Sequence, residues 1–339
     1  MKIKLNLPLV NAHTHAAMVA FRGTAEDLPL RNWLEDHIWP MERARLNPQF
    51  VYRHSKKALR EMRRNGIRAF ADMYFFQDEV IRAAEELKMS ALLGEPLVDF
   101  PAPSYKTPDE AFKILERQLK EHRKHPFVKI GVITHTIYTV CAENLVKAKR
   151  LAKKYNTVFY LHLAETKKEF DDCRKANKAT PVEYLNKLGV LDNRTVLAHC
   201  VWLTSRDIKI LARAGSHVVH CPLSNLKLGS GIAPVAELLK AGVNVALGTD
   251  GAASSNRLDI WEAGKFAALL QKGLHLDPTV LDVKTVLKMM SVNGMRALGF
   301  SEIEGRGIAE IEKEIDNFKH PHILYEKHAN EIFNLKFEI

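Results

Sequence analysis

The sequence lacks the signatures of several large protein classes. Among its 339 residues no apolar run approaches the roughly 18 residues of a membrane span, and Asn6 and Pro8 interrupt the start, where a signal peptide would need an apolar stretch. The four cysteines form no CxxC pair, which excludes a structural zinc knuckle and is typical of a reducing compartment. We therefore expect a cytoplasmic protein that does not bind a membrane.

Nucleic-acid and dinucleotide binding are also poorly supported. Lys and Arg outnumber Asp and Glu by 50 to 40, a net charge of +10, but the basic residues are spread over helical stretches such as 117–124 that contain no aromatic stacking residues. No GxGxxG motif follows an early strand, and Gly229-Ser230-Gly231 lacks the GK[ST] ending of a phosphate-binding loop. We expect no nucleic-acid partner, and a Rossmann-like open sheet remains only as the alternative fold.

What the sequence does contain is a regular alternation of short apolar runs with longer segments of helical period. The predicted strands are residues 9–15, 67–74, 90–98, 128–135, 158–165, 196–201, 217–222 and 243–250. The predicted helices between them include residues 50–65, 77–87, 108–122, 142–154, 181–188, 205–214 and 234–241. Eight parallel strands that each lead into a helix close most readily into a (β/α)8 TIM barrel, which is the α/β fold that we expect.

The domain organisation follows from where this alternation stops. We assign residues 1–300 to the barrel and residues 301–339 to a charged C-terminal tail of uncertain structure. Within the tail, residues 309–318 have a helical pattern, and the alternating residues 332–339 are compatible with a strand.

Several predicted strands end on a polar residue, His220 among them, and in a barrel the carboxyl ends of the strands converge on one face. His13 and His15 lie two residues apart on the first strand, so their imidazoles point to the same side. His162 and Asp250 end two later strands. Three nitrogen donors and one carboxylate suit a divalent ion, zinc first and iron or manganese as alternatives. A polar surface pair is the alternative for His13 and His15 taken alone.

Two further polar residues lie near these strand ends. Glu165 follows His162 by three residues, where a carboxylate beside a metal-activated water can take and return its proton. The alternative for Glu165 is a surface ion pair with Lys167 or Lys168. His199 interrupts the apolar sixth strand, and its alternative is a buried neutral histidine that is hydrogen-bonded to the backbone.

These motifs resemble a known family. The segments HTHAAM, RGTAEDLPLRNWL, HLAET, AHCVWL, SNLKLGSGIAPV and LGTDGAASSN are similar to those of the amidohydrolase superfamily, within it to methylthioadenosine and S-adenosylhomocysteine deaminases, with chlorohydrolases nearby. The resemblance spans residues 8–299. It implies roles for six residues: His13, His15, His162 and Asp250 as ligands of one divalent ion, Glu165 as proton shuttle, and His199, together with Asp250, as orienting the attacking water.

The resemblance also implies substrate contacts. His135 matches a histidine that contacts the substrate, Glu42 resembles a carboxylate that holds ribose hydroxyls, and Trp33 resembles an aromatic wall. Trp33 as plain core and Glu42 as a helix-start carboxylate are the alternatives. Binuclear members have a carboxylated lysine that ends the fourth strand, whereas Lys129 lies near the beginning of that strand, which favours a single ion.

The sequence departs from the family pattern in two places. Relatives usually build a small β-sandwich from segments before the HxH motif and after the barrel, and we expect this domain to be missing here. Its loss would expose part of the barrel, so we expect a homo-oligomer in which the tail covers some of that surface. The loop at residues 94–101 contains no arginine, which puts S-adenosylhomocysteine in doubt as a substrate.

Three functions remain in view. The leading hypothesis is a metal-dependent deaminase of adenine nucleosides, in which water attacks carbon 6 and Glu165 protonates ring nitrogen 1 and the leaving ammonia. The second keeps the site but acts on guanine, cytosine or a chloro-triazine, for which Glu42 would have no ribose to bind. The third is a non-catalytic binding or assembly module, against which the intact set of ligands argues.

Overall fold

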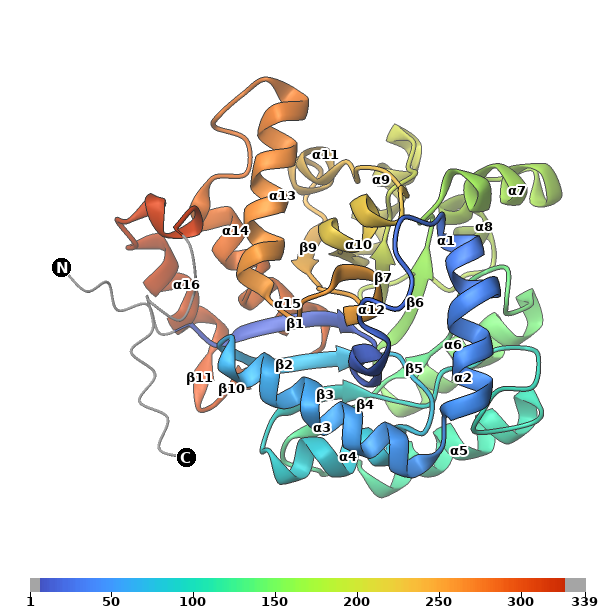
Figure 1. Cartoon of the computed structure of the whole chain (residues 1–339). Helices are drawn as coiled ribbons and strands as arrows, with labels where there is room; N and C mark the ends of the chain where they lie inside the picture. The colour runs from blue at the N-terminus through green and yellow to red at the C-terminus, as the bar shows by residue number, and fades with distance from the viewer. Residues whose placement is uncertain (1–6, 327–339) are drawn as a thin grey trace.

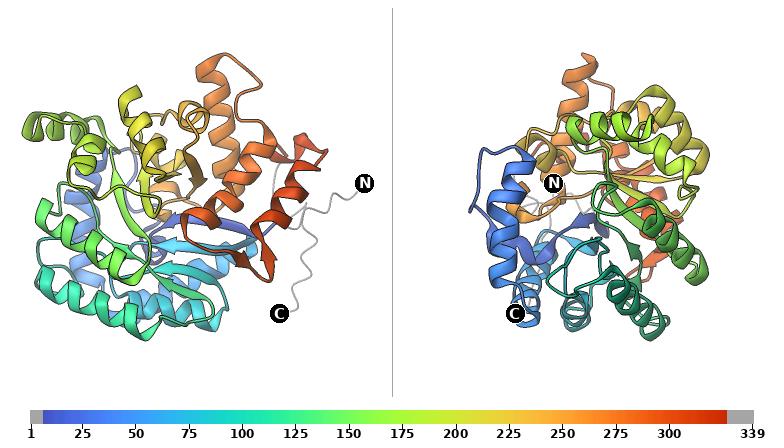
Figure 2. Two further views of the ribbon diagram at one scale, coloured as in Figure 1. Left: turned by 180° about the vertical axis from the view of Figure 1, so that it is seen from behind. Right: turned by 90° about the vertical axis from the view of Figure 1, so that its right-hand side faces the viewer.

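The strands run parallel around a common axis and are covered on the outside by helices, as a computed structural model shows for residues 7–326 (Figure 1). One four-stranded sheet has the order β1-β2-β3-β4, and a five-stranded sheet has the order β5-β6-β7-β8-β9. The strands are β1 (Leu9–Thr14), β2 (Ile67–Asp72), β3 (Ser90–Leu93), β4 (Val128–Ile130), β5 (Val132–Ile133), β6 (Phe159–Leu163), β7 (Thr195–His199), β8 (His217–His220) and β9 (Asn244–Leu247). The right-hand view of Figure 2 shows the helices arranged around these strands.

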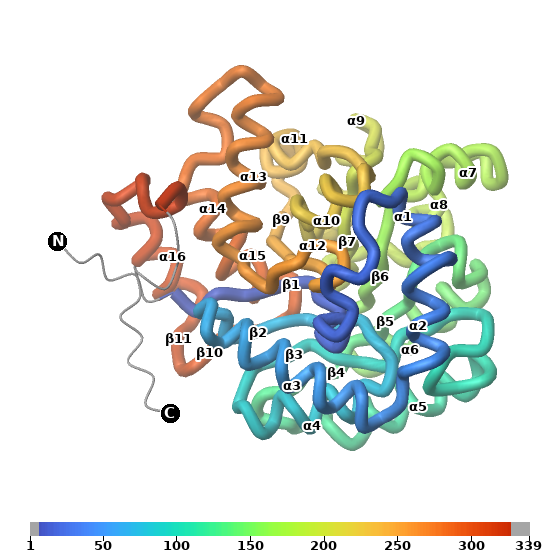
Figure 3. The backbone as a smooth tube through the Cα atoms, in the orientation of Figure 1, coloured from blue at the N-terminus to red at the C-terminus, as the bar shows by residue number. Residues whose placement is uncertain are grey.

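The helices follow the strands in the order that the sequence predicts. They are α1 (Leu30–Asn32), α2 (Trp39–Arg45), α3 (Pro48–Arg64), α4 (Gln77–Glu86), α5 (Pro108–Glu121), α6 (Ala142–Tyr155), α7 (Lys167–Asn177), α8 (Pro181–Lys187), α9 (Ser205–Ala214), α10 (Pro222–Lys227), α11 (Val235–Lys240), α12 (Ala252–Ser255), α13 (Ile260–His275), α14 (Val283–Met289), α15 (Val292–Ala297) and α16 (Ile308–Asp316). Short helical turns are η1 (Ala16–Phe21), η2 (Trp33–Ile38) and η3 (Pro321–Leu324). The path through them can be followed in Figure 3.

Local sequence explains where these helices begin. In α8 the Thr180 side chain accepts from the Glu183 amide while the Glu183 side chain accepts from the Thr180 amide, and Pro181 occupies the first turn. All seven predicted helices are confirmed to within a residue or two at each end. The predicted strands are also present, but each of them ends one to five residues earlier than expected, and the residues after these ends belong to the loops above the barrel.

One predicted strand, residues 128–135, is divided into β4 and β5 at Gly131. The Gly131 amide still donates to the Leu93 carbonyl at 2.8 Å, so the chain continues across the break. A side chain on the facing Gly94 would meet the Gly131 carbonyl at 2.3 Å, so the backbones approach here as only glycine allows. Gly131 is therefore a seam between the two sheets.

The second seam lies between β9 and β1. The Asp250 amide donates to the His13 carbonyl at 3.0 Å. Below it, the Asn11 side chain donates to the Thr249 hydroxyl at 2.7 Å and accepts from the Thr249 amide at 2.9 Å. These contacts join the last strand to the first, and the fold is the expected (β/α)8 barrel.

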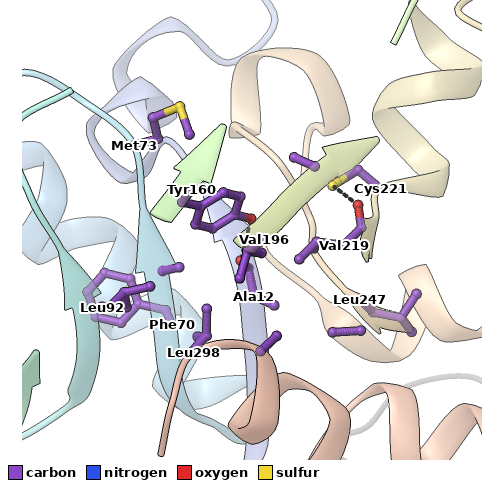
Figure 4. Close-up of a cluster of buried hydrophobic side chains, with 14 of the residues drawn as sticks. Ala12, Phe70, Met73, Leu92, Tyr160, Val196, Val219, Cys221, Leu247 and Leu298 are labelled. Carbon is purple, nitrogen blue, oxygen red and sulfur yellow. Dashed lines mark hydrogen bonds between the residues drawn. The ribbon is translucent and has the colours of Figure 1, made fainter. Parts of the chain in front are cut away.

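Apolar side chains fill the inside of the barrel (Figure 4). Ala12, Phe70, Val196 and Val219 come from four different strands and are fully buried. Tyr160 crosses this layer, and its hydroxyl donates to the Ala12 carbonyl at 2.8 Å. The interior of the barrel is therefore packed with side chains at this level, below the carboxyl ends of the strands.

The C-terminal segment packs against the last helices of the barrel. It consists of the hairpin β10 (Glu302–Ile303) and β11 (Arg306–Gly307), then α16 and η3. Ile311 and Ile315 of α16 are fully buried, and Arg296 and Glu312 pair at 2.8 Å. The predicted helix at 309–318 is confirmed, whereas the strand predicted at 332–339 lies outside the described residues. Across residues 7–326, no helix has both the length and the apolar character that crossing a membrane requires.

Candidate active site

One pocket opens at the carboxyl ends of the strands, and it collects nearly all of the residues that the sequence singled out. Eight of the nine predicted site residues line it: Trp33, Glu42, His15, His135, His162, Glu165, His199 and Asp250. The ninth, His13, is buried directly below, with its Nε2 atom 3.1 Å from that of His162. Residues up to 237 positions apart in the sequence, His13 and Asp250, are thus brought within 3.6 Å. His220, another polar residue at a strand end, ends β8 and is buried, but it does not line the pocket.

Four imidazoles are oriented in the same way, each through its Nδ1 atom. Each Nδ1 faces an oxygen: Tyr160 Oη at 3.1 Å for His13, the Met73 carbonyl for His15, the His135 carbonyl at 3.0 Å for His162, and Asn225 Oδ1 at 2.8 Å for His199. A carbonyl or amide oxygen can only accept, and the Tyr160 hydroxyl already donates to Ala12, so the proton lies on Nδ1. Each Nε2 lone pair is then free to bind a cation.

The separations between these donor atoms fit a single small cation. The Asp250 Oδ1 atom lies 3.1 Å from Nε2 of His15 and 3.6 Å from Nε2 of His13. Ligands at about 2.0–2.1 Å from a tetrahedral ion are about 3.3–3.4 Å apart, which lies within this range. Among the described residues His13 belongs to two groups of donor atoms, one with His15 and Asp250 and one with His162 and His199, and the atoms of each group lie within 4.8 Å of one another. Within residues 7–326 no lysine lines the pocket, and the Lys129 side chain extends to the Gly299 carbonyl.

The electrostatics of these residues also suit a cation. Burial lowers the pKa of His13 to about 4 and, together with the neighbouring His13, lowers that of His162 well below its usual value, so both are neutral. Burial also acts to lower the pKa of His15, but the hydrogen bond and charge of Asp250 outweigh it and raise the pKa to about 9. Burial would raise the pKa of Asp250, yet His13 and His15 hold it well below its usual value. A metal ion binding here would displace the proton from His15.

The backbone at these strand ends adopts a conformation that most residues avoid. Ala164, His199 and Asp250 have φ values of 51°, 71° and 62°, in the left-handed region. Such strain persists only where the surrounding packing imposes it, and it concentrates at functional sites. Gly248 shows how tight that packing is, because a Cβ atom there would lie 2.7 Å from Cβ of His13.

Glu165 is buried beside the candidate metal ligands. Its Oε2 lies 3.7 Å from His199 Nε2, and its Oε1 accepts a long hydrogen bond of 3.5 Å from the Ser230 hydroxyl. Glu169 fixes the backbone by accepting from the amides of Ala164 and Glu165 at 2.8 and 2.9 Å. Burial raises the pKa of Glu165 above its ordinary value. Glu165 is not engaged with Lys167 or Lys168, which pair with other carboxylates, so the surface ion-pair alternative is wrong.

A second buried carboxylate, Glu42, faces the pocket from α2. The Tyr74 hydroxyl donates to its Oε1 at 2.8 Å. Burial raises the pKa of Glu42 to about 7, although the hydrogen bond from Tyr74 acts in the opposite direction. Sequence reasoning missed Tyr74, but it was the last residue of a predicted strand, and that position could have marked it.

Helix geometry explains why Trp33 and Glu42 share one wall. Residues 30–45 form one continuous helix whose middle, η2, is π-helical, with the Trp39 amide donating to the Leu34 carbonyl five residues before it. In a regular α-helix nine residues turn the chain through about 900°, which would place Trp33 and Glu42 on opposite faces. The π turn takes up about one extra residue, which reduces the angle between them to about 80°.

The mouth of the pocket is apolar, in contrast to its base. Phe100 and Tyr138 are 44% and 54% exposed there, and the rings of Trp39 and Phe100 lie 6.4 Å apart. The pocket therefore combines a charged end, near the candidate metal ligands, with an aromatic end near solvent. Such a combination suits a ligand that is polar at one end and apolar at the other.

Comparison with known proteins places the chain among hydrolases. Residues 8–306 match the sequence profile of the amidohydrolase family. A 5-methylthioadenosine/S-adenosylhomocysteine deaminase of Thermodesulfovibrio yellowstonii is 43% identical over 333 residues, which cover 96% of this chain and 75% of that protein. A 5′-deoxyadenosine deaminase of Methanothermobacter thermautotrophicus is 42% identical over 327 residues, 94% of this chain and 75% of that protein.

Solved structures show the same architecture. An adenosine deaminase from Xanthomonas campestris with bound zinc has a TM-score of 0.87 at 38% identity, covering 89% of this chain and 69% of that one. An atrazine chlorohydrolase from Arthrobacter aurescens, complexed with zinc, has a TM-score of 0.82 at 23% identity, covering 89% and 73%. The second likeness supports the fold alone.

Proposed function

The chain belongs to the amidohydrolase family, and we propose that it is a metal-dependent hydrolytic deaminase of adenine nucleosides such as adenosine or methylthioadenosine. Its products would be ammonia and the corresponding inosine analogue. One observation carries this proposal: a single pocket is lined by three of the four candidate metal ligands, by the buried Glu165 and by a second buried carboxylate, Glu42, from α2. The first carboxylate suits proton transfer, and the second suits a sugar.

We assign the metal to His13, His15, His162 and Asp250, with zinc as the ion. The donor separations and the neutral state of His13 and His162 support this assignment. The related adenosine deaminase of known structure contains zinc. A divalent ion in this position supplies Lewis-acid activation of the attacking water.

Proton transfer is the proposed task of Glu165. Because the pKa of Glu165 is raised, it is closer to neutral pH than that of an ordinary glutamate. A group whose pKa is close to the working pH can both accept and donate a proton. It would take one proton from the attacking water and pass it to ring nitrogen 1. It would then carry the second proton of that water, from the new hydroxyl on carbon 6, to the leaving amino group. His199 lies 3.7 Å from Glu165, with its Nδ1 held by Asn225, and would orient the water with Asp250.

Glu42, Trp33 and His135 would recognise the nucleoside. Glu42 offers Oε2, and a further lone pair on Oε1, to the ribose 2′ and 3′ hydroxyls, since Tyr74 occupies only one site on Oε1. Trp33 is 5% exposed and lines the pocket, so it belongs to the hydrophobic core and also forms part of the pocket wall. His135 also lines the pocket, and its Nδ1 lies 3.0 Å from the Thr139 hydroxyl, which leaves Nε2 available.

An ammonia-release assay of the purified protein tests this function. Adenosine, methylthioadenosine and 5′-deoxyadenosine form one set of substrates, and adenine, guanine, cytosine and a chloro-triazine form the other. We expect turnover of the nucleosides. Activity confined to a free base or a triazine would replace the proposal with the alternative substrate class, and no turnover of any substrate by zinc-loaded protein would favour a binding module.

We propose two further properties, its location and its oligomeric state. The four cysteines are free and three of them are buried, which supports a cytoplasmic location. Helix α13 and the residue after it expose Phe266, Leu269, Leu274 and Leu276, and this apolar face supports a homo-oligomer. Light scattering would test the oligomer, and a soluble monomer at all concentrations would contradict it.

A further inference from the structure

The residues at the pocket mouth indicate which chemical group the substrate carries farthest from the reacting carbon. On the proposed function, the base points to the metal ligands and the ribose hydroxyls point to Glu42. The base leaves the ribose ring at carbon 1′ and the 5′ group leaves it at carbon 4′, on the opposite side of the ring oxygen. The 5′ substituent must therefore point away from the ligands, towards the mouth.

The side chains at the mouth are aromatic and aliphatic. Trp39 lies one helical turn before Glu42 on α2, so it borders the same wall. Phe100 from the loop after β3 and Tyr138 from the loop after β5 complete the mouth. Further apolar lining comes from neighbouring parts of the same helix and loop: Leu34, Val98, Pro101, Ala102 and Pro103.

This wall is held in place before any ligand binds. Tyr105 fastens the loop that carries Phe100, because its hydroxyl donates to the Pro96 carbonyl at 2.7 Å and accepts from the Val98 amide at 2.9 Å. At the start of that loop, Asp99 accepts from the Cys141 amide at 2.6 Å and from the Asn144 side chain at 2.7 Å. Both Asp99 oxygens are therefore used within the protein.

Charged partners are scarce at the mouth. An amino-acid tail on the 5′ carbon would bring an ammonium and a carboxylate, and each would need a partner to offset its desolvation. Among the described residues that line the pocket, Arg43 is the one Arg or Lys, and it is exposed. Glu42, which lines the pocket, is assigned to the ribose, and Asp99, which precedes Phe100, is used within the loop.

We infer that the mouth formed by Trp39, Phe100 and Tyr138 selects adenine nucleosides with a small, uncharged 5′ group, such as 5′-deoxy or 5′-methylthio, over those with a zwitterionic amino-acid tail. The wall can contact the thioether of either substituent, but it offers no buried partner to the ammonium and carboxylate of the amino-acid tail. Phe100 is the specificity residue with the clearest test, because it is 44% exposed and its removal leaves the core intact.

The test compares kcat/KM of the zinc-loaded full chain for adenosine, 5′-deoxyadenosine, methylthioadenosine and S-adenosylhomocysteine. We expect methylthioadenosine to exceed S-adenosylhomocysteine by at least about tenfold. Phe100→Ala should lower kcat/KM for methylthioadenosine by roughly 5–20-fold and for adenosine by less than about twofold. Phe100→Arg should raise S-adenosylhomocysteine relative to methylthioadenosine. Tyr325→Ala, an exposed aromatic residue outside the pocket, is the matched control and should change none of these ratios.

The outcomes separate this inference from the proposed function. If adenosine is deaminated but S-adenosylhomocysteine is the best substrate, or if Phe100→Ala lowers all four values equally, the specificity assignment is overturned and the deaminase assignment remains. If no adenine nucleoside is deaminated, the function itself fails. Should Phe100→Ala be poorly soluble, Tyr138→Ala provides the same comparison from the other side of the mouth, and the wild-type ranking is decisive on its own.

Discussion

The Tyr74 hydroxyl and the Glu42 carboxylate are joined by a 2.8 Å hydrogen bond that links the end of the second barrel strand to the helix over the pocket. This contact holds a buried acid in one orientation and leaves its other oxygen towards the pocket. Replacing Glu42 with Ala should lower kcat/KM for adenosine by roughly 10–100-fold, the loss expected for charge-assisted hydrogen bonds to a sugar. The effect on any free base that is turned over should be small, and equal losses for both would exclude a role in binding ribose.

The raised pKa of Glu42 adds a pH dependence. Because burial raises the pKa of Glu42 to about 7, the group gains a proton as the pH falls below 7 and can no longer accept two hydrogen bonds from a ribose. We expect kcat/KM for adenosine to fall on the acid side of pH 7. A Glu42→Gln variant should lose this limb while keeping any limb due to other groups. A profile identical to that of the wild type would assign the titration elsewhere.

Proton transfer can be separated from metal binding at Glu165. Glu165→Gln keeps the size of the side chain but removes its acid–base function, and Glu165 is not among the four candidate ligands. Turnover should fall by about 10² to 10⁴-fold or more, with the zinc content unchanged. The measurements are steady-state kinetics and elemental analysis of the same sample. Undiminished turnover would mean that another residue moves the proton.

The arrangement of donors predicts one divalent ion per chain. Elemental analysis should give a stoichiometry near one, and a chelator should remove both the ion and the activity. Asp250→Ala should reduce the retained metal, because it removes the carboxylate whose pKa the two neighbouring histidines hold low. A reproducible stoichiometry near two, or none retained in protein that never met a chelator, would contradict the site.

The π turn predicts that deleting one residue from this helix will be tolerated. Asp36 is exposed within η2, and removing it would let residues 30–45 form a regular α-helix in which Trp33 and Glu42 remain about 80° apart. We expect this deletion to leave kcat/KM for adenosine within a few-fold of the wild type and still sensitive to Glu42→Ala. Inserting one alanine after Asp36 should instead turn Glu42 away and remove that sensitivity. If the deletion costs as much as losing Glu42, the π turn does not set this register.

Sequence reasoning predicted the barrel and most of the pocket for one physical reason. Strands that are buried on both faces read as unbroken apolar runs, so a histidine or aspartate at the end of such a run is conspicuous. The same signal is present at His220, which ends β8 and is buried but does not line the pocket, so a polar strand end does not by itself identify a pocket residue. Tyr160 and Asn225, which orient His13 and His199, gave no signal, since their partners lie 147 and 26 residues away in the sequence.

The sequence pattern also did not predict the π turn in the helix over the pocket or the break in the strand at Gly131. A π turn depends on what its residues pack against, and both the α and the π form satisfy the backbone locally. The division of one predicted strand reflects the close approach of Gly94 and Gly131, which a single sequence does not show.

Because the barrel is divided into two sheets, an ion at the candidate metal site would also stabilise the fold. His13 and His15 belong to the half that runs from β1 to β4, whereas His162 and Asp250 belong to the half from β5 to β9. An ion bound by all four residues would link the two halves beside the β9–β1 seam. Part of its binding free energy would therefore increase the free energy of unfolding. The same four ligands would then serve both catalysis and the stability of the barrel. Removing the ion should abolish activity and also destabilise the barrel. The loss of stability would be measured as faster amide hydrogen exchange in β1 and β9.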